Sequence, residues 1–203
     1  MEPKTEQVGT KEVIIPQETA RALGRGLRQL LDQPLQELNP YINNLKNAPG
    51  VDQDYVQAME TSIKKTRDLS TKLEKAKEVK IVPLSAGPDF AFSEERETEE
   101  QSPIQSEIII DDTTTPRLNQ LTLAIQHNFN NILNPLMGFS EDIQLSAQDA
   151  TTRQNAEEIL SRSESIFNAI KPIQNADYQL RISTGSNGTT ITPVQPALVN
   201  QKI

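Results

Sequence analysis

The stretch LAIQHNFNNILNPLMGFSEDI, residues 123–143, contains the only histidine of the chain, His127. Apolar residues recur in this stretch in steps of 4, 3, 4, 3 and 4, in the series Ile125, Phe129, Ile132, Leu136, Phe139 and Ile143. Such spacing is typical of one face of an α-helix that packs against other helices. At about 100° per residue, His127 lies roughly 200° from both Ile125 and Phe129. The stretch therefore predicts an amphipathic helix whose lone imidazole points away from the core.

The same apolar pattern also occurs 98 residues earlier in the chain. The earlier series consists of Leu27, Leu31, Pro34, Leu38, Tyr41 and Leu45. Each series is followed by a turn and by a second helical pattern, over residues 55–77 and 153–173. A short β-branched run precedes each unit, and another ends it. The sequence thus predicts two tandem copies of a strand, helix, helix and strand unit.

The boundaries of the two copies follow from composition. The first copy spans residues 1–87, residues 88–104 form an acidic linker, and residues 105–203 form the second copy with a C-terminal hairpin and tail. The Asn187-Gly188 pair predicts the turn of that hairpin. An offset of 95 residues between the copies is the alternative register, because it aligns the two LNP tripeptides. We prefer the offset of 98 because it superposes the whole apolar face.

The helical pattern also predicts how the copies assemble. Two amphipathic helices cannot bury their apolar faces alone, whereas four can. We therefore expect a mainly α fold, an intramolecular four-helix bundle made from two tandem helical hairpins that together form a pseudo-dimer. Each hairpin begins and ends at the same end of the bundle, so we expect the flanking strands to form a small sheet there.

Composition and charge exclude several classes of function. The chain has 203 residues, a net charge of −8 and no basic stripe, which argues against binding to nucleic acid. It has no cysteine, so disulfides and thiolate metal sites are excluded, and with one histidine no metal site is expected. No apolar run is long enough to span a bilayer, and the polar start lacks the features of a secretory signal. We therefore expect a cytoplasmic protein without membrane association.

The run that begins at His127 resembles the phosphoacceptor helix of histidine kinases. The closest likeness is to the subgroup with the signature His-Asp-Phe-Asn-Asn, followed by aliphatic residues and a Gly-aromatic pair. The matching positions are His127, Phe129, Asn130, Asn131, Ile132, Leu133, Gly138 and Phe139. The segment AEEILSRSESI resembles the return helix of the family, so the resemblance covers residues 118–173.

This resemblance implies a histidine-containing phosphotransfer protein of a two-component or phosphorelay pathway. His127 would be the phosphoacceptor and would exchange phosphoryl groups with an aspartate of a response-regulator receiver domain, with a histidine kinase as a further candidate partner. No cofactor is expected on this chain, and any Mg²⁺ would be carried by the receiver. Family members dimerise through this hairpin, so one chain with two copies would be a monomer with a pseudo-dimeric bundle.

Three positions qualify this expectation. Gln29 aligns with His127, and its amide is not a phosphoryl acceptor, so the first copy resembles the same hairpin without its nucleophile. The family carries an acid directly after the histidine as a general base, but this chain has Asn128, which can hydrogen-bond to the histidine and cannot take its proton. Asn131 stands where family members often carry Thr or Asn, and it would orient water or the phosphoryl group, which would give receiver-phosphatase activity.

Two functional hypotheses remain open from the sequence. The ATP-binding domain of the family, with its glycine-rich boxes, is not found in the roughly thirty residues after residue 173, so we expect no ATP-dependent kinase activity from this chain alone. The first hypothesis is phosphotransfer through His127. The alternative is a catalytically silent adaptor that binds a kinase or receiver domain through the surface of its bundle.

Overall fold

The computed structural model describes residues 12–93, 107–111 and 117–194. Within these residues, the same order of elements occurs twice: one strand, two helices and two further strands. The first set is β1 (Val13–Ile15), α1 (Gln17–Lys46), α2 (Gln53–Lys75), β2 (Val79–Leu84) and β3 (Gly87–Phe92). The second set is β4 (Glu107–Asp111), α3 (Arg117–Ser146), α4 (Ala150–Gln174), β5 (Gln179–Gly185) and β6 (Gly188–Val194).

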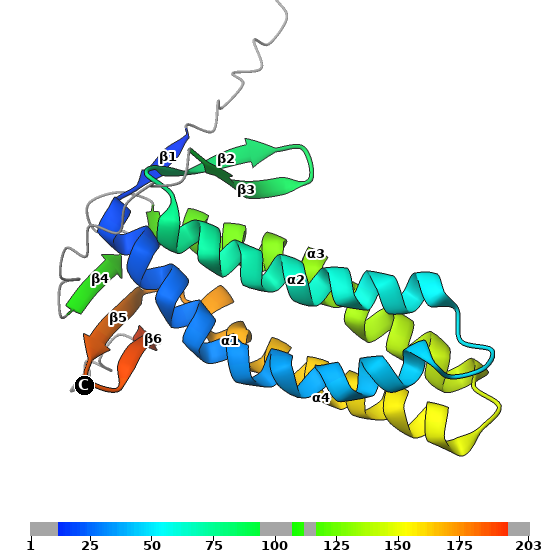
Figure 1. Ribbon diagram of the computed structural model, residues 1–203. Helices are drawn as coiled ribbons and strands as arrows, with labels where there is room; N and C mark the ends of the chain where they lie inside the picture. Colours follow the sequence, from blue (N-terminus) through cyan, green and yellow to red (C-terminus); the bar gives the residue numbers. More distant parts are fainter. Residues whose placement is uncertain (1–11, 94–106, 112–116, 195–203) are drawn as a thin grey trace, which may run out of the picture.

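The four helices pack side by side as a bundle, with both helix-to-helix turns at the end away from the strands (Figure 1). The mainly helical fold that the periodicity predicts is therefore confirmed. Within each set the two helices form a hairpin, and between the sets α1 packs on α4 and α2 packs on α3. None of the helices in the described part of the chain is long and apolar enough to cross a membrane.

Burial along α1 and α3 fits the preferred offset of 98 residues. Every buried position of α1 from Leu23 to Leu45 has a buried counterpart in α3 98 residues later. Apart from Gly24 and Gly26, whose counterparts are Thr122 and Ala124, the buried positions of α1 over this range are Leu23, Leu27, Leu31, Leu35, Leu38, Ile42 and Leu45. Their counterparts in α3 are Leu121, Ile125, Phe129, Leu133, Leu136, Ser140 and Ile143. Pro34, Tyr41, Ile132 and Phe139, which we placed on the core face, are only partly buried because they lie at its border.

The side chains at this border join the two copies. Arg162 on α4 places Nη1 2.6 Å from a carboxylate oxygen of Glu37 and donates from Nη2 to the Tyr41 hydroxyl at 3.1 Å. The Arg162 guanidinium also lies 5.0 Å from the centre of the Tyr41 ring, in cation–π geometry. On the other side of the bundle, the rings of Tyr55 and Phe139 stack with their centres 4.5 Å apart. These contacts hold α1 against α4 and α2 against α3.

The strands differ from the prediction of one small sheet. They form two separate antiparallel sheets of three strands each, in the orders β1-β2-β3 and β4-β5-β6. The separation arises because each copy closes its own hairpin onto its own first strand. Both sheets lie at the end of the bundle that is opposite to the two helix-to-helix turns (Figure 1).

The boundary between the first copy and the linker was also wrong. Residues 88–92, which we assigned to the acidic linker, belong to β3 and pair with β2. Pro88 is accommodated because β3 is an edge strand, where a missing backbone N–H breaks no ladder that the sheet requires. The hairpin predicted at Asn187-Gly188 is present as β5 and β6. The rest of the linker, residues 94–104, and the tail, residues 195–203, lie outside the described residues.

Each hairpin packs on a helix of the other copy, so one of the two hairpins lies over α3. The hairpin of the first copy packs through β3 on α3, and that of the second copy packs through β6 on α1. Each copy thus covers the first helix of the other copy. Because α3 carries His127, the hairpin formed by β2 and β3 is the part of the fold that determines access to the imidazole.

Candidate functional site

The imidazole of His127 lies on the side of α3 that faces away from the bundle core, as the helical spacing predicted. Its Nε2 atom is 3.0 Å from Nδ2 of Asn131, one helical turn further along α3. In the tautomer that carries the ring proton on Nδ1, Nε2 accepts this hydrogen bond from the Asn131 amide. The Nδ1 atom is buried and has no hydrogen-bond partner among the described residues.

The ring is nevertheless not on an open surface. Gly87, at the turn of the hairpin formed by β2 and β3, has a φ of +133° and lies against the imidazole. A Cβ atom added to Gly87 would come within 2.9 Å of Cδ2 and 3.5 Å of Nε2 of His127. The turn therefore covers the Cδ2–Nε2 edge of the ring so closely that only glycine fits. The expectation of an exposed histidine is corrected to a partly buried one, because the spacing along α3 gives no information about a hairpin from the other copy.

Asn128 does not take the role that we expected. Its side-chain nitrogen donates to the carbonyl oxygen of Ala124 at 2.9 Å, so the amide is bonded to the backbone of its own helix and not to His127. Adjacent residues on a helix diverge by about 100°, which explains why Asn131 reaches the imidazole and Asn128 does not. Asn131 is thus the predicted site residue that contacts His127 directly.

Gln29, the counterpart of His127 in the first copy, has the equivalent surroundings. Its Nε2 atom donates to the carbonyl oxygen of Asn187 at 2.9 Å, and its Oε1 atom accepts from the backbone N–H of Thr189 at 2.7 Å. A Cβ atom on Gly188, which has a φ of +108°, would collide with the Gln29 amide. Both copies therefore place one polar side chain of their first helix beneath a turn glycine of the other copy.

Sequence reasoning missed both turn glycines as neighbours of the site. The signal was present in the two similar runs LSAGP, residues 84–88, and GSNGT, residues 185–189. In each run, two residues separate a paired residue from the glycine that begins the next strand. A duplicated turn at matching places would have indicated matching hairpins, although not which helix they cover.

Other polar chemistry around the site is sparse. Gln174 on α4 donates to Asn130 at 3.3 Å and joins the two helices beside His127. Over the described ranges, no group of three or more histidine and carboxylate side chains is placed to hold a metal ion. The arrangement at His127 is thus a single imidazole with one amide in hydrogen-bond contact.

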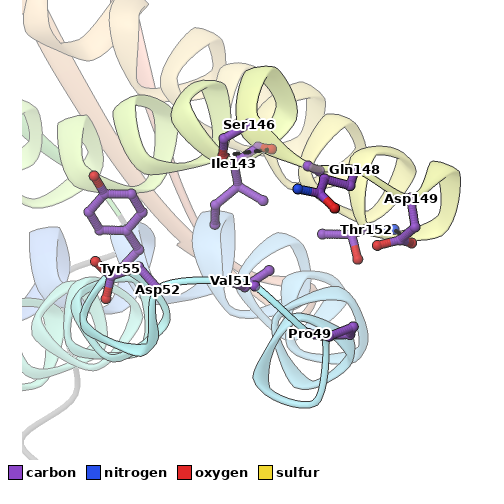
Figure 2. A pocket seen from close by; sticks show the side chains of 11 residues that line it. Pro49, Val51, Asp52, Tyr55, Ile143, Ser146, Gln148, Asp149 and Thr152 are labelled. Carbon is purple, nitrogen blue, oxygen red and sulfur yellow. Dashed lines mark hydrogen bonds between the residues drawn. The ribbon is translucent and has the colours of Figure 1, made fainter.

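A hollow occurs at the end of the bundle that is opposite to the strands (Figure 2). It has a volume of about 590 Å³ and lies between the two helix-to-helix turns, next to Tyr55 and Ile143. Asp149, at its rim, accepts from the backbone N–H of Thr152 at 2.8 Å, and this hydrogen bond lowers the pKa of Asp149. Asp52 caps α2 in the same manner. Both carboxylates therefore serve as helix caps, and the hollow lies about 24 Å from His127 by the rise of α3.

No protein-family model, no curated protein and no solved structure matches this chain. The function must therefore be argued from the geometry around His127 and from the resemblance that its helix bears to phosphoacceptor helices.

Proposed function

We propose that this protein carries phosphoryl groups on His127 and exchanges them with the aspartate of a response-regulator receiver domain in a two-component or phosphorelay pathway. The observation that carries the proposal is the hydrogen bond from Asn131 to Nε2. With the Asn131 amide nitrogen facing the ring, this bond favours the tautomer whose lone pair is on Nε2, the outer nitrogen of the side chain. A neutral imidazole with that lone pair is a nucleophile without prior loss of a proton.

The transfer step can be written from these groups. Nε2 attacks the phosphorus of the aspartyl phosphate, an N–P bond forms, and the bond from phosphorus to the acyl oxygen breaks, so the aspartate leaves as a carboxylate. The ring becomes a phosphoimidazolium, and water must reach the buried Nδ1 to take its proton. Asn131 must release Nε2 as the reaction proceeds, and its amide can then donate to a phosphoryl oxygen. Most of the catalysis would come from alignment of the two proteins and from Mg²⁺ held by the receiver.

The departure at Asn128 is compatible with this chemistry. A general base is required when a kinase histidine must be deprotonated for attack on ATP, whereas a ring already protonated on Nδ1 presents its lone pair on Nε2. Gln29 has no comparable nucleophile and bonds to the opposite hairpin. We therefore assign one reactive site to the pair of copies, and we assign to Asn131 the orientation of water in a receiver-phosphatase reaction.

The second candidate, a silent adaptor, is favoured by one specific observation. The turn at Gly87 lies against the Cδ2–Nε2 edge of His127, which restricts the approach of a second protein to the ring. In this account the bundle surface binds a kinase or receiver domain, and the imidazole packs under the hairpin without taking part in chemistry. The two candidates differ in whether loss of the receiver phosphate depends on His127.

A phosphotransfer assay separates the two candidates. Receiver domains are first phosphorylated with a small-molecule donor, purified, and incubated with the protein or with its His127→Gln variant. We expect the receivers to lose phosphate, and the wild-type protein to gain an acid-labile phosphate that His127→Gln does not gain. Gln126→Ala, which changes an exposed neighbour on the same helix, is the matched control and should behave as wild type.

The same assay can also contradict the proposal. Equal binding of a receiver by wild type and His127→Gln, without movement of phosphate, would favour the adaptor. If the protein neither transfers phosphate to nor binds any member of a broad panel of receivers and kinases, both accounts are contradicted.

A further inference from the structure

The two hairpins hold equivalent places in the fold, which permits a comparison residue by residue. Leu84 pairs with Gly87 across the first turn, and Gly185 pairs with Gly188 across the second. Both glycines have positive φ values. The residue after each glycine is therefore equivalent as well, and these residues are Pro88 in the first hairpin and Thr189 in the second.

The second hairpin is fixed to α1 by specific bonds. Gln29 bonds to its turn on both sides, through the carbonyl oxygen of Asn187 and the backbone N–H of Thr189. Thr189 is buried, so its N–H would lose its acceptor in a position that water does not readily reach. Ile191 of the same hairpin packs so closely on Gly26 of α1 that a Cβ there would overlap it. We call this pair of hydrogen bonds between Gln29 and the turn the latch.

The first hairpin lacks the groups that would form the same latch. Pro88 has no backbone N–H, so it cannot make the bond that Thr189 makes. His127 does not compensate, because its ring bonds only to Asn131 of its own helix among the described residues, and its Nδ1 is buried without a partner. The turn thus lies on the imidazole by contact alone.

The pairing of the strands shows where the first hairpin can bend. Among the residues that the structure describes, β1 pairs with only Val79, Lys80 and Ile81 of β2, so the tip of this hairpin, residues 82–89, is there a two-stranded ribbon. In the second sheet β4 pairs with five residues of β5, from Gln179 to Ser183. A two-stranded ribbon is marginal in water unless it packs on another element. The tip over His127 therefore depends on its contact with α3.

We propose that the hairpin formed by β2 and β3 is a lid over His127, which opens at residues 82–89, whereas the hairpin formed by β5 and β6 stays closed on Gln29. The inference rests on the proposed function for its purpose, since the turn at Gly87 lies against the Cδ2–Nε2 edge and its movement would widen the approach of a phosphoryl group to Nε2. Each hydrogen bond of the latch changes an opening equilibrium about fivefold. Because the first hairpin lacks both bonds, its opening should be favoured about thirtyfold over that of the second hairpin.

Hydrogen exchange tests, without any assumption about function, whether the hairpin without the latch opens more often than the hairpin with it. In the wild-type protein, amides of residues 82–91 should exchange about thirtyfold faster than those of residues 183–192, while the amides of the four helices remain protected. Gln29→Ala should speed exchange in the second hairpin by a similar factor. The double variant Pro88→Thr with His127→Gln installs the latch and should slow exchange in the first hairpin. Equal exchange in the two wild-type hairpins would overturn the inference.

Chemical modification tests the cover on the imidazole. Diethyl pyrocarbonate acylates unprotonated imidazole nitrogens, and its ultraviolet signal reports one site here because the chain has one histidine. We expect wild-type protein to react more slowly than the same protein unfolded in urea. Gly87→Ala should react about tenfold faster than wild type, because its Cβ and its φ of +133° are incompatible with the closed turn.

A matched variant controls for backbone strain. Gly50 has a φ of +80° and nothing near its missing Cβ, so Gly50→Ala adds strain in the α1–α2 turn without touching His127. This variant should keep the wild-type rate of modification. Equal rates for native and unfolded wild-type protein, or equal rates for the two alanine variants, would overturn the lid. If exchange and modification behave as expected while phosphotransfer fails, the lid stands and the proposed function falls.

Discussion

Replacing His127 and Gln29 by leucine should change the stability of the fold in opposite directions. The two side chains occupy equivalent places beneath the turn glycines Gly87 and Gly188. They differ in how their polar atoms are satisfied: Gln29 uses both ends of its amide, whereas Nδ1 of His127 is buried without a partner in the part of the chain that the structure describes. A buried donor without a partner costs about 1–3 kcal/mol relative to an apolar group of similar size. His127→Leu should therefore stabilise the protein.

The magnitudes follow from counting the bonds at each site. His127→Leu removes the penalty at Nδ1 and loses the bond to Asn131, an exposed amide that water can satisfy at a cost of about 0.5 kcal/mol, so the net gain is about 1 kcal/mol. Gln29→Leu leaves the buried N–H of Thr189 unpaired, while the exposed carbonyl of Asn187 turns to water. Its net loss is about 2 kcal/mol. The two variants should thus differ by about 3 kcal/mol.

Urea denaturation monitored by circular dichroism measures this difference. With a denaturant slope of about 3 kcal/mol per molar for a chain of this size, the midpoints of the two variants should lie about 1 M apart with unchanged slopes. His127→Met provides a second apolar side chain in case leucine fits poorly beneath Gly87. Destabilisation by both apolar replacements of His127, to the same extent as by Gln29→Leu, would refute the assignment of an unpaired buried nitrogen.

Three further predictions concern the bundle. Arg162→Gln should lower the free energy of unfolding by about 1–2 kcal/mol, because it removes the hydrogen bond and the cation–π contact with Tyr41, and the urea midpoint measures this loss. Phe129→Ala should cost about 3–5 kcal/mol in the same assay, since the ring is fully buried on α3. Asp149→Ala should destabilise the protein near neutral pH and not in strong acid, where the wild-type carboxyl is also protonated; melting temperatures across pH should show the difference vanish as pH falls through the lowered pKa of Asp149.

The helices were predictable because their signal lies within each helix. Apolar spacing over residues 27–45 and 125–143 identified two amphipathic helices and their equivalence, and burial in the structure follows the same offset. The errors of one residue at Pro34 and Tyr41 arise because positions at the border of a helix face alternate between core and surface. The spacing states which side is apolar but not how wide the contact with a neighbouring helix will be.

The hairpin over His127 was not predictable from local patterns. Gly87 lies forty residues before His127 and belongs to the other copy, so no periodicity connects the two. Pro88 and Asp89 also reduce the strand signal of β3, and the acidic run that follows them made the segment resemble a linker. Edge strands tolerate such residues, and whether a strand is at an edge is decided by the sheet as a whole. Asn131 was predictable as a neighbour of His127 because contacts between residues i and i+4 of a helix are local.

The copies differ at both positions of the latch: the first helix carries Gln29 in one copy and His127 in the other, and the turn carries Thr189 in one and Pro88 in the other. The two differences have a common chemical reason. A backbone N–H at position 88, placed as that of Thr189 is placed, would point toward the side chain at position 127 and could donate to the lone pair on Nε2. Proline at position 88 removes that donor and leaves the lone pair to Asn131, whose side chain can rotate away when a phosphoryl group approaches. Replacing Pro88 alone by threonine should therefore slow acylation of His127, because it adds a backbone donor that cannot rotate away. If His127 is the nucleophile that we propose, its Nδ1, buried without a partner among the described residues, is the structural cost of holding it under a cover that carries no bond to it, a local conflict of the kind that proteins retain at functional sites.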